Sequence, residues 1–121
     1  MSRDKQILGR LGESLARLYY EYEGYGVLAT RFRVREGELD LVVRRGPDLA
    51  FVEVKTRRGE ACGVPAAAVT PRKLRRMRLA ARRYLAAADC PGAARLRFDV
   101  VSVTLRPDGG GLRLELLRGV P

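Results

Sequence analysis

The chain contains no histidine among its 121 residues. That absence excludes a Ser-His-Asp triad, a histidine general base and any zinc site with histidine ligands. The sequence also has no P-loop and no complete GxGxxG motif, because the "GYG" at Gly24–Gly26 lacks the third glycine. The side chains left for catalysis are Asp, Glu, Lys, Tyr, Ser and Cys. Carboxylates without histidine favour a hard, oxygen-binding cation such as Mg²⁺ or Mn²⁺.

Cysteine is scarce, and long apolar runs are missing. The two cysteines, Cys62 and Cys90, are far apart and fit no CxxC spacing, which predicts idle, reduced thiols. The charged N-terminus lacks the apolar core of a signal peptide. No apolar run approaches the ~20 residues that span a bilayer. We therefore expect a cytoplasmic protein without a membrane partner.

Positive charge is what the sequence has in excess. Lys and Arg total 24 against 14 Asp and Glu, which gives a formal net charge of +10. Only Lys5, Lys55 and Lys73 are lysines, so most of this charge comes from arginine, whose planar guanidinium binds phosphate through two hydrogen bonds. The composition favours a nucleic-acid-binding protein over a soluble protein that attracts polyanions only weakly. The length predicts one domain over residues 1–121.

Hydrophobic periodicity and turn residues predict two helices and five strands. One helix is expected over Arg3–Glu23, and a second from Pro71 to about Ala88 with Thr70 as its N-cap. The expected strands are Val27–Val34, Leu39–Arg45, Leu49–Thr56, Arg97–Leu105 and Leu112–Leu117. The order αβββαββ predicts an α/β or α+β domain with a central mixed sheet.

The first helix carries apolar residues at helical spacing, and we expect this stripe to face the core. Its members are Leu8, Leu11, Leu15, Leu18 and Tyr22. Glu13 lies roughly opposite the stripe, which by itself indicates an exposed glutamate. Three small residues, Gly9, Gly12 and Ala16, surround Glu13 on the helix surface and allow another element to approach closely.

Charged residues interrupt the second and third strands, in the stretch "GELDLVVRRGPDLAFVEVKTRR". Pro47 cannot take the positive φ of a type I′ turn, so we expect a four-residue loop, Arg45–Asp48, rather than a two-residue hairpin. Asp40 then falls opposite Glu53, with the two Cβ atoms roughly 5 Å apart. Like charges in that arrangement are destabilising unless a cation lies between them. The pair therefore predicts a divalent metal site.

Lys55 shares a strand face with Glu53, since residues two apart in a strand point the same way. It is placed to orient an attacking water or to stabilise charge on a phosphate. The alternative is the ordinary alternation of a half-exposed strand. The apolar residues Val42 and Phe51 lie on the same face as the charges, which favours a built site over a solvated face.

Several segments match one known family as a set. They are "GRLGESLA" (Gly9–Ala16), "GELDLVV" (Gly37–Val43), "FVEVKTR" (Phe51–Arg57), the segment Gly63–Val69, Lys73, and "RFDVVSV" (Arg97–Val103). The chain resembles the YraN-like family of bacterial proteins, which belongs to the PD-(D/E)xK nuclease superfamily and is related to archaeal Holliday-junction resolvases.

This resemblance implies a restriction endonuclease-like three-layer fold. It also implies that Asp40, Glu53 and Lys55 are the metal and catalytic positions, and that Glu13 is the active-site glutamate of the first helix. The chain departs from the family pattern at Arg31, where an asparagine is expected.

The second helix is strongly basic and has no acidic residue between Pro71 and Arg83. With two arginines just beyond Lys55, it predicts a phosphate-binding surface near the metal site. The residues are Arg57, Arg58, Arg72, Lys73, Arg75, Arg76, Arg82 and Arg83. The alternative is a solvated face whose arginine stems cover apolar surface. Few aromatic residues stand among the arginines, which favours duplex or branched DNA over single strands.

The leading hypothesis is a metal-dependent endonuclease that acts on branched or damaged DNA. Asp40 and Glu53 hold Mg²⁺ or Mn²⁺ in this hypothesis, Lys55 assists the attacking water, and Glu13 completes the site. Two alternatives stay open: a non-catalytic nucleic-acid-binding module with the nuclease fold, and a basic protein associated with RNA or ribosomes. A resolvase needs two active sites, so that substrate predicts a homodimer.

Overall fold

Two helices and five strands form in the predicted order. The computed structural model describes residues 3–59 and 69–120. Its elements are α1 (Arg3–Tyr22), β1 (Gly26–Val34), β2 (Gly37–Arg45), β3 (Asp48–Arg58), α2 (Pro71–Ala87), β4 (Arg95–Leu105) and β5 (Leu112–Leu117). Every predicted element is present, with ends that differ by one or two residues. Cys62 and most of the matched segment at positions 63–69 lie outside the described residues.

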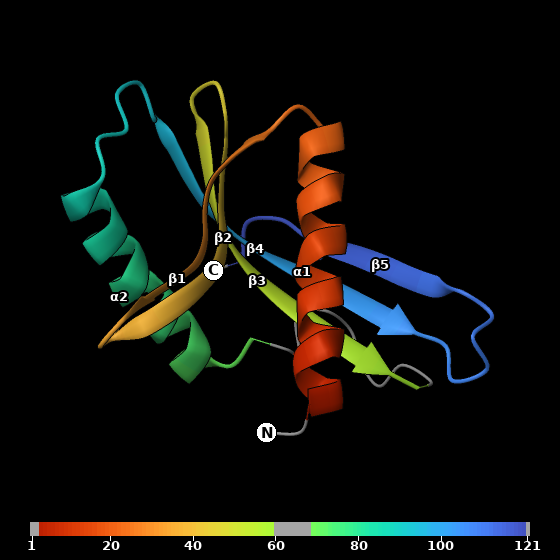
Figure 1. The fold of residues 1–121 in the computed structure, drawn as a ribbon. Coiled ribbons are helices and arrows are strands. Elements are labelled where there is room, and N and C mark those ends of the chain that lie inside the picture. The colour runs from red at the N-terminus through yellow and green to blue at the C-terminus, as the bar shows by residue number, and fades with distance from the viewer. Residues whose placement is uncertain (1–2, 60–68, 121) are drawn as a thin grey trace.

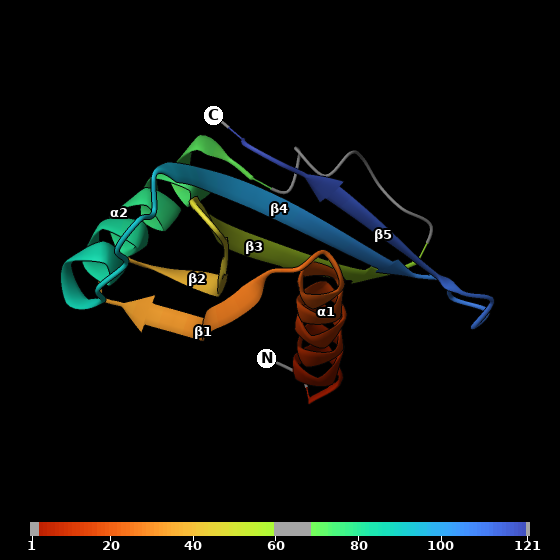
Figure 2. The same ribbon diagram turned by 90° about the horizontal axis from the view of Figure 1, so that it is seen from above.

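The five strands form one mixed sheet in the order β1-β2-β3-β4-β5. All neighbouring strands are antiparallel except β3 and β4, which α2 connects as a parallel pair. Alternate residues of β2 and β3 enter two different cores: Leu41 and Val52 pack with α1, whereas Val42 and Phe51 pack with α2. The helices therefore cover opposite faces of the sheet (Figures 1 and 2). This is the predicted three-layer α+β arrangement of a restriction endonuclease-like domain.

The turn between β2 and β3 is shorter than predicted. Arg45 pairs with Asp48, so the loop contains only Gly46 and Pro47. Gly46 has φ +58. A type II′ turn needs a positive φ at its first central position alone, and proline tolerates the second. The four-residue loop was wrong, but the predicted register is correct, since Val42 pairs with Phe51 and Arg44 with Leu49.

Helix α1 buries a different face from the one predicted. Its buried residues are Gly12, Ala16 and Tyr20. Of the predicted stripe, Leu15 packs against the edge of the core, whereas Leu18 is 62% and Tyr22 89% exposed. The face with the small residues is buried because it lets the helix approach β3 closely. A Cβ added to Gly12 would lie 1.7 Å from Thr56 Oγ1. The expectation of a close approach around Glu13 is thus confirmed at Gly12, and it is wrong at Gly9, where nothing lies within 4 Å.

Two glycines one turn apart on α1 should respond oppositely to alanine. Gly12→Ala is expected to lower the free energy of unfolding by about 1–3 kcal/mol, because the added methyl overlaps Thr56 and pushes α1 off β3. Gly9→Ala, the matched control, should raise it by about 0.5–1 kcal/mol through helix propensity alone. Urea titration of both variants measures the difference. Equal changes for the two variants would show that α1 does not lie this close to β3.

Helix α2 begins at its predicted cap and packs an apolar face against the sheet. Met77, Ala81 and Tyr84 are buried against β2 and β3. The Thr70 hydroxyl accepts a hydrogen bond from the Lys73 amide over 3.1 Å, and Pro71 follows at the first helical position. In the described part of the chain, neither helix is long and apolar enough to cross a bilayer.

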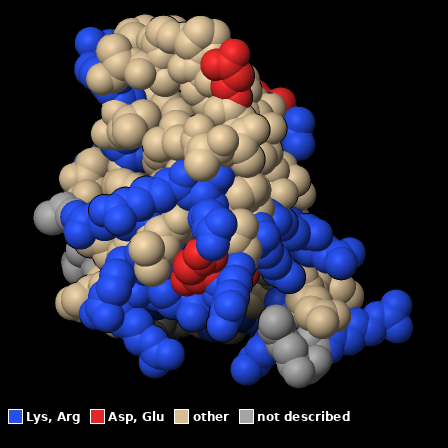
Figure 3. Space-filling model, turned by 90° about the vertical axis from the view of Figure 1, so that its left-hand side faces the viewer, with Lys and Arg blue, Asp and Glu red and all other residues tan. Residues whose placement is uncertain are grey.

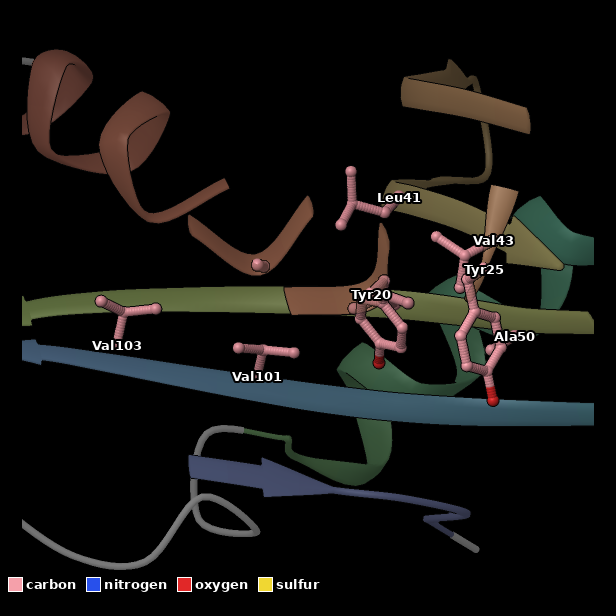
Figure 4. Close-up of a cluster of buried hydrophobic side chains, with 9 residues drawn as sticks. Tyr20, Tyr25, Leu41, Val43, Ala50, Val101 and Val103 are labelled. Atoms are coloured by element: carbon pink, nitrogen blue, oxygen red, sulfur yellow. The ribbon is translucent and has the colours of Figure 1, made fainter. Parts of the chain in front are cut away.

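A buried charged network fastens α1 and the end of the chain to β4. Asp99 is fully buried and accepts hydrogen bonds from Arg97 Nε at 2.8 Å, from the Tyr20 hydroxyl at 2.8 Å and from the Gly119 amide at 3.2 Å. Arg97 also donates to the Tyr25 hydroxyl over 2.7 Å. Figure 4 shows both tyrosine hydroxyls pointing toward β4. Burial, and then the charge of Asp99, raise the pKa of Tyr20, so its phenol stays protonated.

Candidate active site

Asp40 occupies the point where β2 separates from β3. The last pair of the β2–β3 ladder before it is Leu41 with Val52. Beyond that pair the Val54 amide no longer bonds to the backbone of β2. It donates instead to the side chain of Asp40, at Oδ2, over 2.6 Å. The carboxylate thus replaces a strand partner for β3. This bond holds the side chain of Asp40 toward β3, where Glu53 lies.

Asp40 and Glu53 form a half-buried, like-charged pair just past the last rung of the β2–β3 ladder. Burial, and then the charge of Glu53, raise the pKa of Asp40 to about 7, against the hydrogen bond from Val54, which lowers it. Burial also raises the pKa of Glu53, against the charge and hydrogen bond of Lys73, which lower it. Burial makes both carboxyl groups hard to ionise, and the charge of Glu53 adds to this at Asp40, so the pair is destabilised in the absence of a cation.

Lys73 belongs to this site rather than to the open helix surface. It is in the first turn of α2, and its Nζ lies 3.3 Å from Glu53 Oε1. Lys55 is exposed and lies close enough to Glu53 to lower the pKa of that carboxyl. No described residue pairs with the Lys55 ammonium, so it is available to a water molecule or a phosphate. The two lysines therefore approach the same carboxylate from different elements.

Glu13 reaches the site from α1, on the other side of the sheet. Its side chain is 22% exposed, and its Oε1 accepts a hydrogen bond from Arg31 Nε over 2.8 Å. Its charge also contributes to the raised pKa of Asp40. Glu13 is therefore not the simply exposed glutamate that its helix position alone indicates. The structure places it beside Asp40, where the family resemblance puts the helix glutamate.

The predicted acids lie near one another but do not converge on one point. Across residues 3–59 and 69–120, no three Asp, Glu or Cys side chains are close enough to hold one ion together. Arg31 holds Glu13, and Lys73 holds Glu53. The charge of Glu53 acts on Asp40 most strongly, and the charge of Glu13 acts on it less.

A groove of about 770 Å³ adjoins these residues between the first turns of α1 and the end of β3. Glu13 and Lys55 both contribute to its wall. Three further basic residues line it: Lys5, Arg57 and Arg58. Arg57 and Arg58 thus lie next to the candidate site, as predicted. The groove has the charge and position to accept a phosphate backbone beside the carboxylates.

The outer face of α2 is the second basic surface. Its exposed arginines are Arg72, Arg75, Arg76, Arg78, Arg82 and Arg83. Figure 3 shows basic side chains gathered over the lower part of the α2 side of the molecule, around a small acidic patch. Arg83 already has an internal partner, because its Nε donates to Glu36 Oε2 over 2.8 Å. Among the predicted phosphate-binding residues of α2, Arg83 and Lys73 are therefore engaged within the protein.

Comparison with known sequences identifies the family of this chain. The model of "Uncharacterised protein family UPF0102" matches residues 12–103. The chain belongs to the UPF0102 family. It is 49% identical over 118 residues to a UPF0102 protein of Frankia alni, which covers 97% of this chain and 96% of that protein. It is 48% identical over 118 residues to a UPF0102 protein of Beutenbergia cavernae, which covers 98% of both. The YraN-like resemblance is confirmed, since this is the same family.

The UPF0102 match includes all the residues that the structure brings together. Glu13, Asp40, Glu53 and Lys55 were predicted as a group, and they lie in one region of the fold. Arg31 was missed as a site residue. A signal was present: the short turn at Arg35 and Glu36 sets the β1–β2 register, and counting along it places Arg31 opposite Asp40.

Proposed function

We propose that this UPF0102 protein is a divalent-cation-dependent endonuclease that hydrolyses phosphodiester bonds in DNA, with branched or damaged duplexes as its substrate class. The observation that carries the proposal is the half-buried pair of Asp40 and Glu53, whose pKa values are both raised. A protein that only needed stability would gain by replacing such a pair with apolar residues. An enzyme that must concentrate negative charge at one point needs it.

The side chains at this point fit Mg²⁺ or Mn²⁺. Asp40 and Glu53 offer anionic oxygen donors, and the chain has no histidine that would favour zinc or copper. Asp40 and Glu53 would hold the cation, and Glu13, which Arg31 holds in the free protein, would complete the set once released. Such a cation supplies an activated water and charge stabilisation at the phosphate.

Residues of the chain would orient the metal-binding acids and act on the water and the phosphate. The Val54 amide orients Asp40 through its 2.6 Å hydrogen bond. The exposed Lys55 ammonium lies where it can hold a water molecule by hydrogen bonding or stabilise negative charge on a phosphate oxygen. Hydrolysis forms one bond from the water oxygen to phosphorus and breaks one P–O bond of the backbone. No histidine is needed in this scheme.

Basic surfaces on two sides of the site fit a nucleic-acid partner. The groove carries Arg57 and Arg58, and the outer face of α2 carries Arg72, Arg75 and Arg82. These arginines would position the phosphate backbone without reading sequence. A homodimer is part of the proposal, because two cuts in a branched duplex need two active sites. The solution mass with and without four-way DNA tests that part.

The proposal predicts cleavage that depends on a divalent cation. Purified protein is incubated with labelled four-way, nicked and linear duplex DNA in Mg²⁺, Mn²⁺ or EDTA, and the products are resolved on denaturing gels. We expect cleavage with Mg²⁺ or Mn²⁺ and none with EDTA. Lys55→Ala should slow cleavage by about 100-fold while binding persists, because Lys55 acts on the reacting groups. Unchanged cleavage by Lys55→Ala would contradict the assigned site.

A second candidate is a nucleic-acid-binding module that does not cut. The pairing of Glu13 with Arg31 and of Glu53 with Lys73 favours it, because both acids already have cations of the protein as partners. This candidate predicts salt-sensitive DNA binding without cleavage under any metal. Competition between DNA and RNA of the same length tests an RNA partner in the same series.

A further inference from the structure

The two acids that flank Asp40 are each neutralised by a basic residue from another element. Arg31 Nε lies 2.8 Å from Glu13 Oε1, and Lys73 Nζ lies 3.3 Å from Glu53 Oε1. Both pairs are only half-enclosed, since Arg31 is 41% and Lys73 42% exposed. Asp40, between them, forms no ion pair with a basic side chain of residues 3–59 or 69–120 and accepts a hydrogen bond from the Val54 amide instead. The acids of the site therefore hold two positive charges of the protein's own.

Arg31 is placed there at a conformational cost. It is the single non-glycine residue with positive φ in residues 3–59 and 69–120, at φ 49. An arginine in this left-handed region is strained relative to ordinary strand geometry. The pairs Thr30–Leu41 and Phe32–Leu39 place it directly opposite Asp40 in the β1–β2 register. The hydrogen bond and charge of Glu13 raise the pKa of Arg31, and Asp40 adds to the rise.

We propose that Arg31 and Lys73 are exchangeable cations of the active site: they neutralise Glu13 and Glu53 in the free protein and pass to phosphate oxygens of the nucleic acid when a divalent cation binds the acids. Both are then positioning residues for the scissile region of the backbone. This proposal rests on the proposed function of the same site. It explains why exposed, flexible basic side chains, rather than buried ones, hold the acids, since only such side chains can change partner.

The exchange makes the divalent cation and the nucleic acid bind with positive coupling. A divalent cation that takes over Glu13 and Glu53 frees two basic side chains for phosphate, and phosphate that takes those side chains frees two acids for the cation. Thermodynamic linkage makes the two effects equal. Added salt otherwise weakens binding to nucleic acid by competing for phosphates. The part of any tightening that is lost when Arg31 and Lys73 lose their charge is therefore diagnostic of the exchange.

The coupling is measured by fluorescence anisotropy with a labelled DNA duplex in Ca²⁺ or EDTA at matched ionic strength, with gels to confirm intact DNA. Wild-type protein should bind the duplex about fivefold or more tightly with Ca²⁺. Arg31→Asn and Lys73→Gln should each reduce this enhancement, and the double variant should abolish it. Asparagine is chosen because it tolerates positive φ, so the variant removes charge without changing the backbone. Arg33→Asn is the matched control. Arg33 lies on β1, as Arg31 does, and its exposed ion pair is with Glu38 of β2, so this variant should keep the full enhancement.

A second readout separates exchange from a merely structural role. Calorimetric titration of Ca²⁺ into DNA-free protein should show tighter binding to Arg31→Asn than to wild type, by about threefold or more, because the acids lose a competing cation. Structural damage would weaken Ca²⁺ binding instead. Full enhancement in the double variant, or weaker Ca²⁺ binding by Arg31→Asn, would overturn the exchange while leaving the nuclease proposal intact. Absence of Ca²⁺, Mg²⁺ and Mn²⁺ binding to the wild type would overturn both.

Discussion

Asp99→Ala is expected to lower the free energy of unfolding by about 3–5 kcal/mol, because it leaves Arg97 without its anion in a site that is largely closed to water. Asp99 is fully buried, and Arg97 is 20% exposed. The substitution also removes the hydrogen-bond acceptor of the Tyr20 hydroxyl and of the Gly119 amide. Small domains are stable by about 5–15 kcal/mol, so the variant should keep little of its stability. Urea denaturation followed by circular dichroism measures the change.

Asp48→Ala is the matched control for this prediction. Asp48 pairs with Arg95, two residues before Arg97 on the same strand, but Arg95 is 69% exposed. An exposed ion pair contributes little, so this variant should lose less than about 1 kcal/mol. Tyr20→Phe should fall between the two, at about 1 kcal/mol, since it removes one hydrogen bond and no charge. Similar losses for Asp99→Ala and Asp48→Ala would show that the network around Asp99 is not closed to solvent.

Asp40→Asn should make the protein more stable and abolish its proposed activity. The amide removes the negative charge beside Glu53, keeps an oxygen for the Val54 amide, and offers a hydrogen-bond donor to Glu53. Each unit of pKa shift corresponds to about 1.4 kcal/mol, and part of the shift of Asp40 comes from Glu53, so we expect a gain of about 1–3 kcal/mol above pH 7. Cleavage should fall at least about 100-fold, and added Mn²⁺ should no longer raise the melting temperature.

The stability gain should depend on pH with a definite sign. The pKa of Asp40 rises from 3.8 to about 7 on folding, so the folded protein binds this proton more tightly than the unfolded chain does. The wild type therefore loses stability from this group as the pH rises from about 4 to about 7. The advantage of Asp40→Asn should vanish near pH 4 and be full above pH 7. Glu38→Gln, two residues away and 53% exposed, should stay within about 0.5 kcal/mol of the wild type. A destabilised Asp40→Asn protein above pH 7 would contradict the destabilised pair.

The hairpin of β2 and β3 shows how a site can be predicted despite an error in its turn. The predicted loop had four residues and the observed loop has two, because a type II′ turn accepts proline after a glycine with positive φ. Both loops pair Arg44 with Leu49, so both place Asp40 near Glu53. In an antiparallel hairpin the residue numbers of every pair add up to the same total, and a two-residue and a four-residue loop centred on the same bond give the same total. The acid pair was therefore predictable from the spacing of charged and apolar residues.

Helix α1 shows the opposite case. Its periodicity contains two candidate core faces: the leucine stripe and the face with Gly12, Ala16 and Tyr20. Hydrophobicity favours the leucines, so the prediction was wrong. The sheet accepts the other face because only small residues permit contact between α1 and Thr56, and because Tyr20 on that face reaches the buried Asp99. Neither partner is near in the sequence, so local pattern could not choose between the faces.

The elements, their order and the strand register follow from short-range chemistry along the chain: periodicity, caps, turn residues and the resemblance of its motifs. The acids of the candidate site follow from the same register. The same counting places Arg31 opposite Asp40, but it does not predict which acid each basic side chain pairs with. Glu13 meets Arg31 across 18 positions, and Glu53 meets Lys73 across 20, from helices that cover opposite faces of the sheet. Such contacts depend on how separate elements pack. A charged side chain pairs with the opposite charge that the tertiary fold brings within a few ångströms of it, and the spacing of residues along the sequence does not determine that distance.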